Sequence, residues 1–167
     1  MKYALLFISM FAFLSSLSVK AQVIGCTATS LRTLSRIESN LDQGYKARIC
    51  VDDTYYSSDT LARLASKGAA IIIHADLQYY SSDSMIKIAK VGEFILDSTR
   101  STYYSSDSLG AIAKTGGTIM LRSGLRYYSS DSLKSIAQKG HLILINDEPY
   151  YSSSTLDELL KLGAEIY

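Results

Sequence analysis

Apolar residues return along the chain in triplets that occupy positions i, i+3 and i+4. That spacing places all three side chains on one face of an α-helix. The triplets are Leu61/Leu64/Ala65, Met85/Ile88/Ala89, Leu109/Ile112/Ala113, Leu133/Ile136/Ala137 and Leu156/Leu159/Leu160. After each comes a glycine and then a short apolar run, such as Thr118 to Leu121, which has the composition of a β-strand. The pattern predicts helices that alternate with strands.

Polar residues mark the ends of each predicted helix, as the copy from 103 to 126 illustrates. Ser105 is placed to cap the helix N-terminus, with Tyr104 before it and Leu109 one turn on as a hydrophobic staple. Asp107 falls in the first turn, where the helix dipole favours negative charge. Gly116 follows the helix and suits a left-handed C-terminal residue. We therefore expect a helix bounded on both sides by its own sequence.

The unit repeats with a fixed period. Tyr-Tyr pairs begin at residues 55, 79, 103, 127 and 150, and glycines stand at 68, 92, 116, 140 and 163, so the spacing is 24 residues until the last step of 23. Such a period is typical of solenoids, in which each unit buries its apolar face against its neighbours. A strand joined to a parallel strand through a helix crosses over with a right hand. The sequence predicts an α/β fold, a right-handed β/α solenoid of 24-residue repeats with a parallel sheet on one side and helices on the other.

In period and layout the stretch from about Ser30 to Tyr167 resembles the leucine-rich-repeat class of β/α solenoids. The likeness is to the class, because the leucine-rich consensus with its Asn or Cys position is absent. The sequence Tyr-Tyr-Ser-Ser-Asp, which leads into the predicted helix and is called the Tyr-Tyr-Ser-Ser-Asp corner below, occurs instead. The resemblance implies a fold and carries over no functional residue.

The chain divides into three parts. Residues 1–21 have the basic start, apolar stretch and small-residue end of a secretory signal, and the apolar part is shorter than the ~20 residues that a membrane span needs. Residues 22–52 form a divergent N-terminal capping repeat, and residues 53–167 hold four full repeats and a shorter C-terminal one that begins at Tyr150. We expect cleavage before Gln22 and a secreted or periplasmic product. The alternative is a bacterial lipoprotein anchored through Cys26, because Val23 to Cys26 resembles a lipobox.

The only two cysteines, Cys26 and Cys50, both fall in the capping repeat. In an exported chain such a pair favours a disulfide. Closing a loop of about 25 residues would stabilise the fold by roughly 3.5 kcal/mol on the chain-entropy model. The alternatives are an acylated Cys26 or two free thiols.

The net charge and the lack of known catalytic motifs reduce the number of functional classes to consider. The net charge is +1, from 17 basic and 16 acidic residues, which gives no electrostatic footprint for nucleic acid. The sequence has no phosphate-binding loop, Cys-x-x-Cys or His-Glu helix motif. Counting from the glycines places His74 and His141 on opposite sheet faces three strands apart, too far to share a metal. Asp97 is expected at a packing flaw in an otherwise apolar strand row. We predict no catalytic, cofactor-binding or metal-binding residue and no cofactor.

Counting from the same glycines also assigns the two sheet faces, since strand residues alternate sides. The row three residues after each glycine is predicted to be the core beneath the helices, and it comprises Ile71, Ile95, Ile119, Ile143 and Ile166. The other face becomes a candidate interaction surface, and it comprises Ile72, Phe94, Leu96, Met120, Leu142 and Leu144. If it has no cover, its apolar area implies a protein partner or self-association. The alternative is that the two faces are reversed.

The tyrosine pairs form a second candidate surface. The second member of each pair is predicted to point inward, namely Tyr56, Tyr80, Tyr104, Tyr128 and Tyr151. The first members would then form an outer tyrosine row, namely Tyr55, Tyr79, Tyr103, Tyr127 and Tyr150. These rings could stack on one another, or they could offer an aromatic track to a polysaccharide.

These observations favour a non-enzymatic exported repeat protein, acting as a protein-interaction or self-assembly scaffold through the apolar sheet face. The alternatives are a carbohydrate-binding surface protein that uses the outer tyrosine row, and a purely structural envelope protein. An enzyme is disfavoured, because the repeat disperses the polar residues. No nucleic-acid partner and no transmembrane segment in the mature chain are expected.

Overall fold

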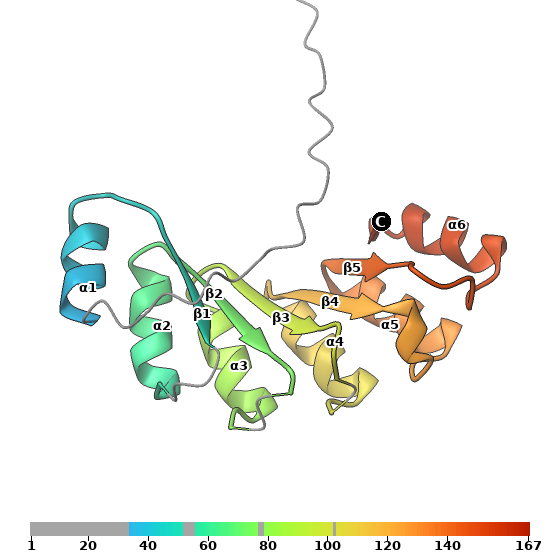
Figure 1. Cartoon of the computed structure of the whole chain (residues 1–167), viewed down its shortest axis with the longest axis horizontal. Coiled ribbons are helices and arrows are strands. Elements are labelled where there is room, and N and C mark those ends of the chain that lie inside the picture. The colour runs from blue at the N-terminus through green and yellow to red at the C-terminus, as the bar shows by residue number, and fades with distance from the viewer. Residues whose placement is uncertain (1–33, 52–55, 77–78, 102) are drawn as a thin grey trace, which may run out of the picture.

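The computed structural model describes residues 34–51, 56–76, 79–101 and 103–167. Helices and strands alternate through these residues (Figure 1). The helices are α1 (Leu34–Asp42), α2 (Ser58–Ser66), α3 (Ser82–Ala89), α4 (Ser106–Lys114), α5 (Ser130–Lys139) and α6 (Ser153–Lys161). The strands are β1 (Ala47–Val51), β2 (Ala69–His74), β3 (Phe94–Ser98), β4 (Thr118–Arg122), β5 (Leu142–Ile145) and β6 (Glu165–Ile166), with a 3₁₀ turn η1 (Ser123–Leu125) after β4.

The strands form one parallel sheet in chain order, from β1 to β6. Helices α2 to α5 line up along one side of that sheet in Figure 1. Their buried side chains share one large core with the strand residues that face them. The predicted α/β class with a parallel sheet and alternating helices is therefore confirmed.

Each of α2 to α6 is directly preceded by a serine whose hydroxyl accepts a hydrogen bond from the backbone N–H three residues on, at 3.2 to 3.3 Å. These N-caps are Ser57, Ser81, Ser105, Ser129 and Ser152. A cap of this kind stabilises a helix by about 1 kcal/mol. The prediction that local sequence sets the helix starts is confirmed.

The prediction for the sheet faces is wrong in part, because the faces do not follow a constant count from the glycines. Ile71, Ile119 and Ile166 pack toward the helices as predicted, whereas Ile95 and Ile143 point to the opposite side. We call that opposite side the far face. The reversed assignment fails as well, because the phase changes from one repeat to the next.

The candidate interaction surface is divided accordingly. Only Ile72 and Met120 lie on the far face. The other four predicted members lie in the core beneath the helices with at most 1% of their surface exposed, and they are Phe94, Leu96, Leu142 and Leu144. The prediction that these four are exposed is wrong.

The conformation of the glycine explains the change of phase. Gly68 is left-handed, with φ +97°, and the residue after it, Ala69, points into the core. Gly140 is extended, with φ 173°, and the residue after it, His141, is exposed. The first residue that faces the core is therefore one position after Gly68 but two positions after Gly140. Because side chains alternate along a strand, this shift of one residue places every following side chain on the other face. Ile71 therefore pairs with Phe94, and Ile119 with Leu142, at spacings of 23 residues.

The N-terminal predictions lie partly outside the described residues. The predicted strand of the capping repeat, Ala47 to Val51, is present as β1. The predicted signal and Cys26 lie outside the described residues, so the cleavage, the boundary at residue 21 and the bridge stay predictions. Cys50 is half-buried on β1 beside the far-face cluster. Among the described residues, no helix is long and apolar enough to cross a membrane.

Candidate functional site

The inner tyrosines join each repeat to the one before it. The Tyr80 hydroxyl donates to the Tyr56 carbonyl at 2.7 Å, and the Tyr104 hydroxyl donates to the Tyr80 carbonyl at 2.6 Å. Tyr128 and Tyr151 repeat the bond toward Tyr104 and Tyr128, at 2.6 and 2.7 Å. The predicted inward orientation is confirmed, and the hydroxyls form a ladder between consecutive repeats.

Burial gives these phenols a distinct electrostatic environment. The inner tyrosines from Tyr80 to Tyr151 are at most 9% exposed. Desolvation raises the pKa of Tyr104, Tyr128 and Tyr151 to about 12, because a buried phenolate would lose its hydration. The hydroxyls therefore remain protonated donors, which is what a bond to a carbonyl requires.

The outer tyrosine row is exposed along the same edge of the molecule. Tyr79, Tyr103, Tyr127 and Tyr150 expose 64, 54, 61 and 47% of their surface. Tyr55, its predicted first member, lies outside the described residues. Tyr103, Tyr127 and Tyr150 each contact the inner ring of their own repeat edge to face, with centroids 4.9 to 5.1 Å apart. These contacts within a repeat, rather than the expected stacking between repeats, orient three of the rings.

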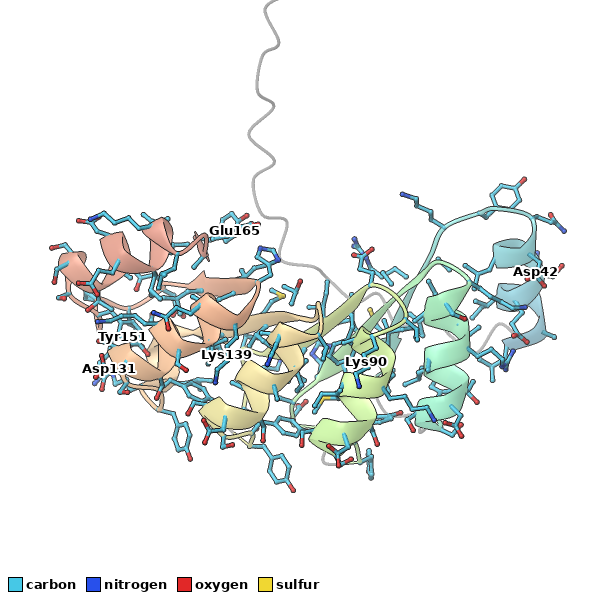
Figure 2. The ribbon with its side chains drawn as sticks, turned by 180° about the vertical axis from the view of Figure 1, so that it is seen from behind. Asp42, Lys90, Asp131, Lys139, Tyr151 and Glu165 are labelled. Carbon is cyan, nitrogen blue, oxygen red and sulfur yellow. The ribbon has the colours of Figure 1, made fainter. Side chains whose placement is uncertain are left out.

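Carboxylates and hydroxyls recur beside the outer tyrosine row. Four residues after each of Tyr79, Tyr103 and Tyr127 stands an exposed aspartate in the first turn of a helix, namely Asp83, Asp107 and Asp131. The cap serines between ring and carboxylate are exposed as well. Figure 2 shows Asp131 near Tyr151, whose hydroxyl bonds the carbonyl three residues before Asp131. The three repeats that begin at Tyr79, Tyr103 and Tyr127 thus each carry an exposed ring, an exposed hydroxyl and an exposed carboxylate within five consecutive residues.

A basic side chain approaches the outer tyrosine row between Tyr127 and Tyr150. The Arg126 guanidinium lies over the Tyr150 ring, 5.8 Å from its centroid. Its Nη2 also donates to Glu148 Oε2 at 2.9 Å. The carboxylate offsets the positive charge, so this contact orients the Tyr150 ring without making the edge basic.

The far face holds a small apolar cluster bordered by polar side chains. Ile72, Ile95 and Met120 form its centre and are at most 6% exposed. Beside them the Nδ1 atom of His74 lies 3.1 Å from Oδ2 of Asp97. A largely buried cluster offers less apolar surface to a partner than the sequence pattern predicts.

Asp97 is tightly held rather than left at a packing flaw. Its Oδ1 accepts from the Thr99 backbone N–H at 3.0 Å and from the Thr99 hydroxyl at 2.6 Å. Burial acts to raise the pKa of Asp97, but the hydrogen bonds from His74 and Thr99 outweigh it and lower the pKa to about 2. The His74–Asp97 pair fastens β2 to β3.

The prediction that the two histidines point to opposite faces is wrong. His141 also lies on the far face, where its Nε2 is 2.8 Å from Glu165 Oε1 and its Nδ1 is 3.1 Å from the Thr118 hydroxyl. The Tyr167 hydroxyl and His141 lower the pKa of Glu165. The two histidines still belong to separate carboxylate pairs on β2–β3 and β5–β6. Within the described ranges, no three His, Cys, Asp or Glu side chains group so as to hold a metal ion.

The aspartates beside the outer tyrosine row are the candidate residues that sequence reasoning missed. The sequence pattern alone interprets each of them as an acidic residue that the helix dipole favours in the first turn. The signal available in the sequence was the constant four-residue step from tyrosine to aspartate in consecutive repeats. No protein-family model and no curated protein matches the chain.

Proposed function

We propose that this chain is a non-enzymatic exported repeat protein that binds an extended ligand along the outer tyrosine row. The observation that carries the proposal is the exposure of Tyr79, Tyr103, Tyr127 and Tyr150, at 47 to 64%. The inner tyrosine of each pair supplies the inter-repeat hydrogen bond, so the outer ring is not needed for that contact. Large rings in a regular exposed array supply contact area at a low cost in side-chain entropy.

The outer tyrosine row supports binding better than the apolar sheet face does. Four of the six residues expected on that face belong to the core, and Ile72 and Met120 are only 1% and 6% exposed. Buried side chains have little area left to remove from water on association. We therefore assign the proposed binding role to the outer tyrosine row rather than to the apolar sheet face.

The architecture suits an extended ligand. We take the fold to be a right-handed β/α solenoid of 24-residue repeats, similar in layout to the leucine-rich-repeat class. This is supported by tyrosine hydrogen bonds between residues 24 apart and by the handedness of parallel crossovers. In such a fold equivalent side chains follow one another along a line. Export by the signal of residues 1–21, to a secreted or periplasmic location, rests on the sequence pattern.

The test removes two neighbouring rings. In the Tyr103→Ala/Tyr127→Ala variant, retention on immobilised polymers should fall about 100-fold, taking about tenfold per lost ring contact. The panel contains cellulose, chitin, dextran sulfate and single-stranded DNA, and the readout is the fraction of mature chain bound at equilibrium. Tyr45→Ala is the matched control, because Tyr45 is 64% exposed and precedes β1, outside the outer tyrosine row. Equal retention of the double variant and the wild type on every polymer would refute the proposal.

A further inference from the structure

We infer that the ligand of the outer tyrosine row is a neutral polysaccharide, an inference that rests on the proposed function. Three properties of the edge lead to this ligand class: its exposed rings, its exposed carboxylates and hydroxyls, and the identity of these groups from one repeat to the next.

The first step is the chemistry of one repeat. A pyranose ring has an apolar C–H face and a rim of hydroxyl groups. Tyr103 offers an exposed ring for the apolar face. The exposed Asp107 offers carboxylate oxygens that accept hydrogen bonds from the rim, and charge-assisted bonds of this kind are the stronger ones. The exposed cap residue Ser105 lies between them. Its hydroxyl accepts from the Ser108 N–H and donates to the Ser108 hydroxyl, which leaves one lone pair to accept from the sugar rim.

The second step is periodicity. Tyr-Tyr-Ser-Ser-Asp occurs unchanged at 79–83, 103–107 and 127–131, and the outer tyrosine of each is exposed. A folded protein partner presents different chemistry at successive positions, so identical subsites in a line do not match it. A homopolymer presents the same sugar at each step. Each subsite then adds to the others by raising the effective concentration of the next sugar.

The third step is charge. Asp83, Asp107 and Asp131 place three exposed carboxylates along the edge, and Lys134 offsets part of the charge of the last one, with its Nζ 3.4 Å from Asp131 Oδ1. Arg126, the basic residue at the last ring, is already bonded to Glu148 at 2.9 Å. Polymers with phosphate or sulfate groups are bound by unpaired Lys and Arg side chains and are repelled by carboxylates. The row therefore selects against nucleic acids and acidic polysaccharides.

The experiment compares neutral and anionic polymers with the mature chain. We expect retention on cellulose, chitin or a soluble neutral β-glucan in affinity gels, and no retention on dextran sulfate. The Asp107→Asn/Asp131→Asn variant should bind the neutral polymer at least fivefold more weakly and should gain affinity for dextran sulfate. Asp157→Asn is the matched control, because it removes one exposed carboxylate from α6 outside the Tyr-Tyr-Ser-Ser-Asp corners. Circular dichroism establishes that each variant is folded.

The outcomes separate the two proposals. Tyrosine-dependent retention on a neutral polymer, weakened by the aspartate changes, supports both. Tyrosine-dependent retention on dextran sulfate or DNA alone overturns the neutral polysaccharide and leaves the row as a binding surface. Tyrosine-dependent self-association without polymer retention overturns both, because the row would then bind a second copy of the chain rather than an extended ligand. Retention that is equal in the wild type and the Tyr103→Ala/Tyr127→Ala variant overturns both.

Discussion

At the scale of single residues, the two tyrosines of each pair have opposite environments although they are neighbours in the chain. Tyr104 is 5% exposed and donates to the Tyr80 carbonyl, whereas Tyr103 is 54% exposed and contacts the Tyr104 ring. Alternation along an extended segment is enough to turn one ring inward and the other outward. The inner residue therefore contributes to stability, and the outer one is left exposed for the proposed binding role.

Replacement of the two residues by phenylalanine should separate these roles. Tyr104→Phe leaves the buried Tyr80 carbonyl without this donor and should lower the free energy of unfolding by about 1–2 kcal/mol. Tyr103→Phe removes an exposed hydroxyl and should change it by less than about 0.5 kcal/mol. Urea denaturation of both variants provides the measurement. Equal effects of the two changes would contradict the assignment of inner and outer residues.

Asp97 gives the protein a defined acid sensitivity. Its pKa is about 2 in the folded state, against an ordinary value of 3.8. A carboxyl whose pKa is lowered by folding stabilises the protein above its unfolded pKa, and that contribution is lost as the pH falls through the folded pKa. The contribution of Asp97 to the free energy of unfolding is about 2 kcal/mol. It is lost as the pH falls from about 4 to about 2.

The Asp97→Asn variant isolates this contribution. The difference in unfolding free energy between the wild type and the variant should shrink by about 2 kcal/mol between pH 5 and pH 2, because Asn does not titrate. Subtracting one titration from the other removes the effect of the remaining carboxyl groups. A difference that stays constant over this range would show that the His74 and Thr99 bonds do not hold Asp97 in solution.

At the scale of elements, the glycine between helix and strand decides which strand residues face the core. Gly68 needs its left-handed conformation, and a Cβ there would meet nothing within 4 Å. Gly140 has an extended backbone, but a Cβ there would lie 2.2 Å from the Ala113 carbonyl oxygen of the preceding repeat. The first glycine is required by backbone conformation and the second by close packing of helix ends.

Asparagine substitution distinguishes the two requirements, because Asn tolerates the left-handed region better than Ala does. Gly68→Ala should lower the free energy of unfolding by about 1–2 kcal/mol, and Gly68→Asn should lower it by about half as much or less. Gly140→Ala and Gly140→Asn should both cost about 2 kcal/mol or more, because either Cβ meets the Ala113 backbone. Chemical denaturation of the four variants provides the measurement. Rescue by Asn at position 140 would rule out the steric explanation.

At the scale of the whole molecule, stability comes from contacts between neighbouring repeats. The inner tyrosine hydroxyls, the strand ladder and ion pairs such as Lys134–Glu158, at 2.7 Å, all join one repeat to the next. A solenoid held in this way is weakest at its ends, where a repeat has a single neighbour. The predicted bridge between Cys26 and Cys50 would strengthen the N-terminal end.

Cys50→Ser should therefore lower the unfolding free energy by roughly 3.5 kcal/mol under oxidising conditions, on the chain-entropy model. Under reducing conditions the wild type should lose the same amount, and the variant should lose none. Thermal melts with and without reductant provide the comparison. Two thiols that react readily with an alkylating agent in the native chain would contradict the bridge, and a lipid mass on Cys26 would replace it with the lipoprotein alternative.

The sequence by itself determined the local features of this protein. Cap serines, apolar triplets and tyrosine pairs act within a few residues of their own position, so helix starts and the inner and outer rings could be predicted from spacing. With the structure in hand, the residue after each glycine is seen to differ between the two strand phases. It is Ala69, Gly117 or Ala164 where it must fit beneath the helices, and Glu93 or His141 where it points away.

Only the tertiary structure decided which side of the sheet each strand residue occupies, because that choice depends on how the glycine passes the preceding repeat. A strand has a side-chain period of two, so one residue of difference moved Phe94, Leu96, Leu142 and Leu144 from the predicted surface into the core. The same shift places Asp97 on β3 beside His74 on the neighbouring strand β2. Contacts between residues 23 positions apart depend on register, and register is a property of two strands together rather than of either sequence alone.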